Sequence, residues 1–257
     1  MQQHFGTGTL WGTATSDALG NTIANPSPVK FGILQDTGFS FERDLKMLYG
    51  QQAFAVAVAG GKMKLSIKAK LAQISGRIYN DLFFGQALST GTLTAVQEDL
   101  TGTAIPSTPG NSITLTPPSS GSFARNLGVL DSNGLPMQLV SSMPALSGQY
   151  SVSASGVYSF CPSDAGKVVY ISYTYTVAAT NAKTLTLTNP IMGTVPIFGV
   201  DFSARYMGKQ ATFRFPTCAS KKLGFDPKQD DFAASDFDIE AFADPVSGAV
   251  CTLSFSE

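Results

Sequence analysis

The stretch KMKLSIKAK, residues 62–70, alternates lysine with apolar side chains more cleanly than any other part of the chain. Successive side chains of a β-strand point to opposite faces, so this pattern predicts a strand with one charged and one buried face. The charged face holds Lys62, Lys64, Ser66, Lys68 and Lys70. The buried face holds Met63, Leu65, Ile67 and Ala69.

The period of the apolar pattern changes directly after this strand. Apolar residues recur at spacings of i, i+3, i+7 and i+11, which is one stripe of a helix. They are Leu71, Ile74, Ile78 and Leu82. Gly85 is well placed to end such a helix. The sequence predicts a helix here and no other convincing one.

Runs with a period of two elsewhere in the chain predict further strands. They cover residues 29–34, 39–41, 149–154, 157–161, 167–177, 200–206, 211–215 and 250–255. The stretch DFDIE, residues 236–240, also alternates, with three carboxylates on one face and Phe237 and Ile239 on the other. The predicted fold class is therefore mostly β, a sandwich or barrel-forming domain with one flanking α-helix.

Composition divides the chain into a core and an insertion. From about residue 93 the sequence becomes rich in Thr, Ser, Pro and Gly, as in the loop-like segments at 105–110 and 117–121. These segments open a second group of strands. We therefore expect residues 98–190 to form a β-rich insertion or subdomain, and residues 1–97 and 191–257 to form the two parts of the core.

A long excursion separates the first strands from the lysine-rich one. It runs from Glu42 to Gly61, with Tyr49-Gly50 at its tip and an apolar run at 54–58. One interpretation is a projecting hairpin with an adhesive arm. The other is an ordinary long hairpin packed on its own domain.

The composition points away from several function classes. Charged residues make up 14% of the 257 residues, well below the usual quarter or so, which favours surfaces buried between subunits. The net charge of −1 argues against a general nucleic-acid binder. Cys161, Cys218 and Cys251 give neither a disulfide framework nor a zinc pattern, so we expect a reducing compartment. No secretory signal is expected, because residues 1–15 have neither a basic nor an apolar region of the kind that such a signal needs. No membrane span is expected, because the longest apolar run, 54–59, is too short.

Catalytic and cofactor motifs are not predicted. The one histidine, His4, lies near an end of the chain and has no partner motif. The glycines around Gly6 and the Gly60-Gly61-Lys62 segment fit neither a dinucleotide fingerprint nor a phosphate loop. Asp236, Asp238 and Glu240 offer oxygen ligands, but apolar residues lie between them where a calcium loop needs a glycine turn. Spacing alone leaves a glycosidase carboxylate pair open, without the aromatic platform expected beside one.

The lysine face at 62–70 and the carboxylate face at 236–240 are complementary ladders. If the two strands are neighbours, within a subunit or across an interface, their charges fix the register of pairing. The alternative is two independently solvated faces.

Three stretches together resemble the tail tube proteins, or major tail proteins, of tailed bacteriophages. The first is KMKLSIKAKLAQISGRIYNDLFFG, residues 62–85, in which the lysine-rich strand runs into the helix. The second is SGQYSVSASGVYSFCPSDAGKVVYISYTYT, residues 147–176, of a type common in phage structural proteins. The third is KLGFDPKQDDFAASDFDIEAFADPVSGAV, residues 222–250, in which an acidic strand precedes a short last hairpin.

The resemblance implies a non-enzymatic virion protein. Its subunits form hexameric rings lined by a β-barrel, and the rings stack into a tube through which DNA and a tape-measure protein pass without sequence-specific binding. It implies a place in the virion tail after assembly in the host cytoplasm, with no membrane partner and no cofactor; whether a sheath surrounds the tube is left open. The excursion would reach the adjacent ring through Glu42, Leu45, Tyr49, Phe54 and Val56.

A conduit for DNA must not hold phosphates, so its wall should be acidic or neutral. We therefore expect carboxylates to line the bore or to neutralise lysines near it. The candidates are Asp226, Asp230, Asp231, Asp236, Asp238 and Glu240, facing Lys62, Lys64, Lys68 and Lys70. The alternatives are a baseplate, tail-terminator or head-decoration protein, and, from another class, a carbohydrate-binding β-sandwich or a hydrolase.

Overall fold

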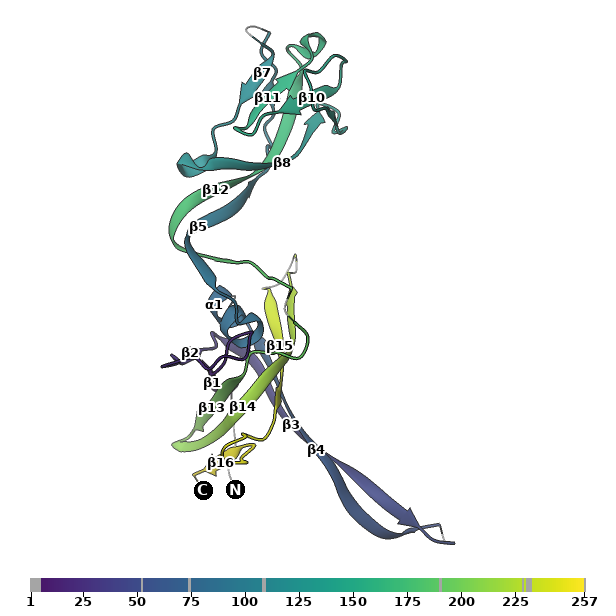
Figure 1. The fold of residues 1–257 in the computed structure, drawn as a ribbon, viewed down its shortest axis with the longest axis vertical. Coiled ribbons are helices and arrows are strands. Elements are labelled where there is room, and N and C mark those ends of the chain that lie inside the picture. Colours follow the sequence, from purple (N-terminus) through teal and green to yellow (C-terminus); the bar gives the residue numbers. More distant parts are fainter. Residues whose placement is uncertain are drawn as a thin grey trace. The chain divides into compact units, whose positions relative to one another are not determined.

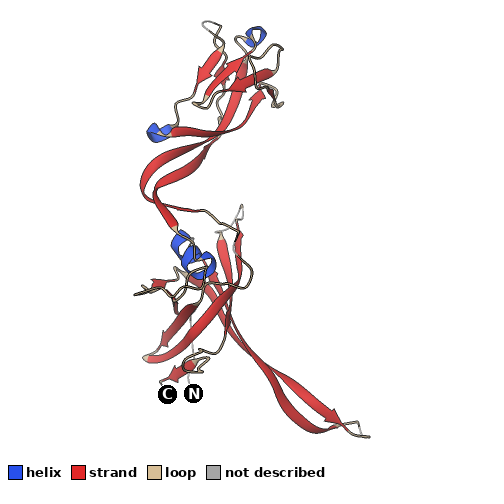
Figure 2. Ribbon diagram, in the orientation of Figure 1, coloured by secondary structure: helices blue, strands red, loops and turns tan. Residues whose placement is uncertain are grey.

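The computed structural model describes residues 6–51, 53–73, 75–107, 110–189, 191–227, 229 and 233–256. The chain forms two compact units, each considered by itself below. Unit 1 comprises Met1–Leu88 and Leu185–Glu257, and unit 2 comprises Ser89–Thr184. Strands dominate both units, which confirms the predicted mostly β fold class (Figure 2).

Unit 1 is built on one antiparallel sheet with the order β2-β1-β13-β14-β15-β4-β3, in which β16 also pairs with β14 (Figure 1). Its strands are β1 Thr9–Ala14, β2 Val29–Lys30, β3 Leu34–Tyr49, β4 Ala55–Leu71, β13 Phe198–Tyr206, β14 Lys209–Asp226, β15 Ala234–Ala241 and β16 Thr252–Phe255. A short helix, α1 Gly76–Tyr79, continues into a π-helical turn, η1 Asn80–Phe84.

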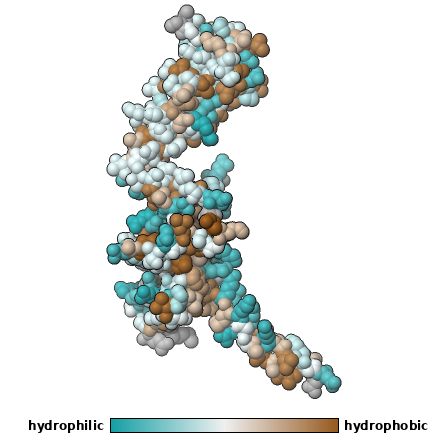
Figure 3. Space-filling view, in the orientation of Figure 1, coloured by the Kyte–Doolittle hydropathy of each residue, from teal (hydrophilic) through white to brown (hydrophobic). Residues whose placement is uncertain are grey.

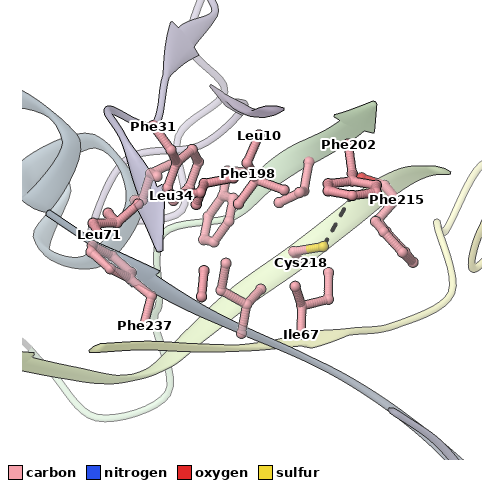
Figure 4. Close-up of a cluster of buried hydrophobic side chains, with 14 of the residues drawn as sticks. Leu10, Phe31, Leu34, Ile67, Leu71, Phe198, Phe202, Phe215, Cys218 and Phe237 are labelled. Carbon is pink, nitrogen blue, oxygen red and sulfur yellow. Dashed lines mark hydrogen bonds between the residues drawn. The ribbon is translucent and has the colours of Figure 1, made fainter. Parts of the chain in front are cut away.

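The sheet of unit 1 curls until its edge strand contacts strands far away in the sheet order. Phe39 of β3 packs on Phe202 of β13, with ring centroids 4.9 Å apart, and on Phe215 of β14, at 5.6 Å. The enclosed side chains form the core (Figure 4). Those with no exposed surface include Leu10, Phe31, Ile67, Leu71, Phe198, Phe215, Cys218 and Phe237. Burial of these side chains is the main source of stability of the unit.

The predicted helix is shorter than the apolar stripe. It begins at Gly76, because Leu71 is the last residue of β4 and pairs with both Leu34 and Ser235 in the sheet. Ile78 and Leu82 are buried as expected, and Gly85 ends the helix in the left-handed conformation, at φ 59°. Ile74 lies outside the described residues. The periodicity therefore identified the buried face correctly and the start of the helix wrongly.

The strand predictions for unit 1 differ in their extent. The alternation at 62–70 is confirmed, since Leu65, Ile67 and Ala69 are buried within β4 and the lysines are exposed. The strand expected at 29–34 is wrong beyond Lys30. The amide of Phe31 donates to the carbonyl of Leu10, and no strand resumes until Leu34, where β3 begins.

Unit 2 is a sandwich of two four-stranded sheets. One sheet has the order β7-β11-β10-β9, and in the other β12 pairs with β5, β6 and β8. The elements are β5 Leu88–Gln97, β6 Thr103–Ala104, β7 Ser112–Thr114, η2 Pro118–Ser120, β8 Ser122–Asp131, β9 Gln138–Leu139, β10 Gln149–Val152, β11 Val157–Phe160, η3 Pro162–Asp164 and β12 Val168–Leu185. Side chains from both sheets, such as Tyr158 and Ile171, share one core.

The edges of the predicted insertion are corrected by strand pairing. Composition placed them at 97/98 and 190/191, whereas the compact unit spans Ser89–Thr184. Residues 89–97 belong to unit 2 because β5 pairs with β12. The composition changes at about residue 93, which lies inside β5, so composition could not mark the boundary between the two units.

A nearly buried carboxylate, Asp164, ties together two turns of unit 2. It accepts hydrogen bonds from the Ser147 hydroxyl at 2.5 Å, the Gly148 amide at 2.8 Å and the Lys167 ammonium at 2.7 Å. Burial by itself raises the pKa of Asp164, but the hydrogen bonds from Lys167 and Ser147 outweigh it and leave the pKa lowered. The carboxylate form is therefore the one that the fold stabilises.

We expect Asp164→Asn to lower the free energy of unfolding of unit 2 by about 1–3 kcal/mol at neutral pH. Because the folded pKa lies below the ordinary value of about 3.9, this contribution is present above that pH and is lost as the pH falls through the folded pKa. Urea unfolding followed by hydrogen exchange of β10–β12 measures it. Asp201→Asn, at an exposed carboxylate of unit 1, is the control and should leave these amides unchanged.

Candidate assembly surfaces

The hairpin of β3 and β4 leaves the body of unit 1 as a two-stranded arm (Figure 1). Its described residues from 45 to 59 are exposed or half-buried, and none is among the buried core residues. At its tip, Phe54 is 87% exposed and Val56 is 71% exposed. The projecting hairpin is thus the correct one of the two interpretations of the excursion.

A shift in strand register decides which side chains share a face of the arm. Arg43 pairs with Met63, but Leu45 pairs with Gly60, so β4 has one residue more than β3 at this point. A Cβ atom on Gly61 would lie 3.0 Å from the carbonyl oxygen of Asp44, which explains why glycine occupies the irregularity. An added residue reverses the alternation of the strand beyond it.

The result is an arm with one bulky face. Met47 lies opposite Val58, and Tyr49 contacts Met47 through its hydroxyl, 3.2 Å from the sulfur. We call Leu45, Met47, Tyr49 and Val58 the apolar arm face. On the other face Leu48 and Lys46 lie opposite Ala57 and Ala59. Without the shift, Ala59 would lie opposite Met47, and Val58 would lie on the other face of the arm.

The apolar arm face continues the core-facing side of the sheet beyond the core. Along β3 the core side chain Phe39 is followed on the same side by Phe41, which is 49% exposed. On β4 Met63, opposite Arg43, is 62% exposed. In the space-filling view, brown apolar surface lies toward the end of the arm, beside teal polar surface (Figure 3). An uncovered apolar surface of this kind marks a site of interaction.

The second surface is the outward face of four neighbouring strands. Strands β4 and β15 pair so that Lys70 lies opposite Asp236 and Lys68 lies opposite Asp238. The two complementary ladders are therefore neighbours within one subunit. The other neighbour of β4 is β3, where Asp36 pairs with Lys70 and Glu42 pairs with Lys64.

Lysines of β14 complete this pattern. Lys222 lies opposite Asp238, and the ammonium of Lys221 is 3.1 Å from a carboxylate oxygen of Glu240. Lys64 contacts the same oxygen at 3.1 Å. Hydrogen bonds from Lys221 and Lys64 lower the pKa of Glu240, and Glu240 in turn raises the pKa of Lys64. Glu240 therefore stays ionised at neutral pH and joins three strands.

We call this surface the charge-striped face. Its six lysines are Lys62, Lys64, Lys68, Lys70, Lys221 and Lys222. Its six carboxylates are Asp36, Glu42, Asp226, Asp236, Asp238 and Glu240. These lysines and carboxylates alternate across the strands, so positive and negative side chains offset one another on the face. Asp230 and Asp231 lie outside the described residues.

Sequence reasoning missed part of this face. It assigned Glu42 to the excursion and did not consider Asp36, Lys221 or Lys222. The pairing of β3 with β4 and of β14 with β15 brings them together. The only local signal was the Lys221-Lys222 doublet in a strand region, which gives no indication of its partner.

In the described part of the chain, no group of three or more His, Cys, Asp or Glu side chains could hold a metal ion. The three carboxylates that offer oxygen ligands in the sequence, Asp236, Asp238 and Glu240, lie beside lysines. The three cysteines are free thiols, and burial raises the pKa of Cys218 to about 12. His4 lies outside the described residues. None of the described helices combines the length and apolar character needed to cross a membrane.

Comparison with known proteins adds no family assignment. No protein-family model matches the chain, and no curated protein matches it. The two surfaces are therefore the features of the chain that bear on its function.

Proposed function

We propose that this chain is a structural, non-enzymatic subunit of a phage tail tube. Its copies assemble into hexameric rings that stack into a hollow tube, and DNA passes through the tube in the virion. The observation that carries the proposal is the arm, an extension of the core-facing side of the sheet whose large apolar side chains have no cover within the described subunit. An exposed apolar surface lowers the solubility of a monomer, whereas its burial between copies stabilises a polymer.

The charge-striped face supports the same proposal. DNA binds to proteins mainly through lysines and arginines that displace counterions from its phosphates. Here each lysine column lies beside a carboxylate column, so the face offers phosphates no net attraction. We assign this face to the wall that DNA passes. A neutral wall allows the duplex to move.

Electron microscopy of the purified full chain tests the proposal. Tubes or stacked rings of uniform width are the expected result. Single capped rings would favour a tail-terminator or baseplate component instead, and dispersed monomers would favour a carbohydrate-binding module. A saccharide-binding screen on the monomers would then test that alternative.

Neutralising two carboxylates of the charge-striped face should create a DNA-binding protein. We expect the double variant Asp236→Asn/Asp238→Asn to bind duplex DNA at roughly 50 mM salt and to release it by roughly 200 mM, because the face then loses two of the negative charges that offset its lysines. Fluorescence anisotropy with a labelled duplex measures this. The control Glu98→Gln/Asp201→Asn removes the same total charge at residues that are not among the six carboxylates of the face, and it should not bind. Equal binding by both variants would contradict the assignment.

A further inference from the structure

A cavity of unit 2 has no part in the two assembly surfaces. Its volume is about 490 Å³, within the range of roughly 300–1,000 Å³ that is usual for ligand pockets. Three connections between strands contribute to its lining: the one from β8 to β9, the one from β9 to β10 and the one from β11 to β12. Loops that a rigid sandwich holds together in this way are frequent places for binding sites.

The floor of the cavity is apolar. Ile105 and Val169 line it, and both belong to the core between the two sheets of unit 2, with 2% and 0% of their surface exposed. Leu135 and Met137 add further apolar lining. Apolar side chains of this kind offer contact to the carbon–hydrogen face of a ligand.

The first polar wall is the turn that follows β8. The carboxylate of Asp131 accepts hydrogen bonds from the amides of Asn133 and Leu135, both at 2.8 Å. The amide of Asp131 in turn donates to the carbonyl of Leu135 at 2.9 Å. These bonds fix the backbone of the turn before a ligand arrives. Ser132 and Asn133 therefore line the cavity from a preorganised backbone, which lowers the entropic cost of binding.

The second polar wall is the cluster around the nearly buried Asp164. Asp164, Ser147 and Lys167 all line the cavity. The ammonium of Lys167 donates to Asp164 at 2.7 Å and to Ser147 at 3.1 Å. An ammonium has three N–H groups, so Lys167 retains one for an oxygen atom of a ligand.

The charges of the lining decide which ligand fits. Among the described residues the lining holds two carboxylates, Asp131 and Asp164, and one ammonium, Lys167. An anionic ligand would meet an excess of negative charge. A cationic ligand would meet the ammonium of Lys167, which lies close enough to contribute to the lowered pKa of Asp131. A neutral ligand is therefore favoured.

Hydroxyl groups match the polar atoms of both walls. A hydroxyl group donates to carboxylate and side-chain oxygens and also accepts from N–H groups, and the walls offer both kinds of partner. The apolar floor adds the need for a carbon–hydrogen face. A sugar ring without a charge combines several hydroxyl groups with such a face.

We propose that this cavity binds a neutral saccharide, with one face of the sugar ring on Ile105 and Val169 and its hydroxyl groups on the two polar walls. The site lies within unit 2 and does not depend on assembly, so it is a binding activity beyond the proposed function. A single hexose has few atoms, and we expect it to bind with a dissociation constant of about a millimolar.

Saturation-transfer NMR of the full chain tests this proposal with four sugars at roughly millimolar concentration. We expect signal transfer to at least one of glucose, galactose and N-acetylglucosamine. Glucuronate, which carries a carboxylate where glucose carries a hydroxymethyl group, should give none.

The double variant Ser132→Ala/Asn133→Ala removes the polar side chains of the first wall and keeps its backbone hydrogen bonds. It should weaken binding by about tenfold or more, because several hydrogen bonds to the ligand are lost. Ser132→Trp, which places a bulky side chain in the lining, should also prevent binding. Ser141→Ala/Ser142→Ala is the matched control, at exposed residues outside the lining, and should bind as the unaltered protein does.

The remaining outcomes would overturn the site. They are signal transfer to none of the sugars, equal transfer to glucose and glucuronate, and equal binding by the Ser132→Ala/Asn133→Ala variant and its control. Circular dichroism of each variant shows that a loss of binding is not a loss of fold. Assembly is scored separately by electron microscopy. A chain that binds sugar and forms no tubes would keep this site and lose the tube function, and tubes that bind no sugar would do the reverse.

Discussion

The variant Val58→Asp is expected to remain a folded protein that no longer polymerises. Val58 is 59% exposed in the subunit and touches no core residue cluster, so its replacement should change the free energy of unfolding by no more than about 1 kcal/mol. In the proposed polymer this position lies in the contact between copies. An unpaired carboxylate there costs several kcal/mol, which corresponds to at least a hundredfold or so increase in the concentration needed for assembly.

Sedimentation of the variant beside Val246→Asp provides the comparison. Both changes replace an exposed valine of unit 1 with aspartate, and both add one negative charge. Only the arm variant should lose the ability to pellet as large particles. Equal assembly by the two variants would show that the arm is free in the polymer.

The second large effect concerns the fold of unit 1. Phe237 of β15 has no exposed surface and packs on Phe31, with centroids 5.8 Å apart, and on Tyr79, at 5.7 Å. It joins the sheet to the helix α1 that covers it. We expect Phe237→Ala to destabilise unit 1 by about 3–5 kcal/mol, because it removes buried apolar surface and leaves a cavity.

Phe225→Ala is the matched control for this change. Phe225 lies on the adjacent strand β14 and is 49% exposed. Its replacement should cost less than about 1 kcal/mol in urea unfolding monitored by circular dichroism. Similar losses for the two variants would mean that β15 is not part of the buried core.

The local pattern was sufficient to predict the element types that depend on alternation. Residues 62–70 and 236–240 each show one apolar and one charged face, and both strands have those faces in the structure. Of the two interpretations of the complementary charges, neighbouring strands and independently solvated faces, the first is correct. The pairing of two such strands can be predicted from the sequence because charge and burial both repeat with the period of the strand.

What the sequence could not predict depends on contacts between distant segments. The start of the helix depends on Leu71, which the sheet holds through Leu34 and Ser235, far away in the sequence. The division of the arm into a bulky and an alanine-rich face depends on one extra residue near Gly61.

We propose that identical copies cover the exposed apolar surfaces of this subunit. Sedimentation velocity of the unaltered full chain over a wide range of concentrations tests this proposal. We expect a small species at low concentration and, above a threshold, particles whose size keeps growing rather than stopping at one oligomer. A single monomeric species at every concentration, with the protein folded, would contradict it.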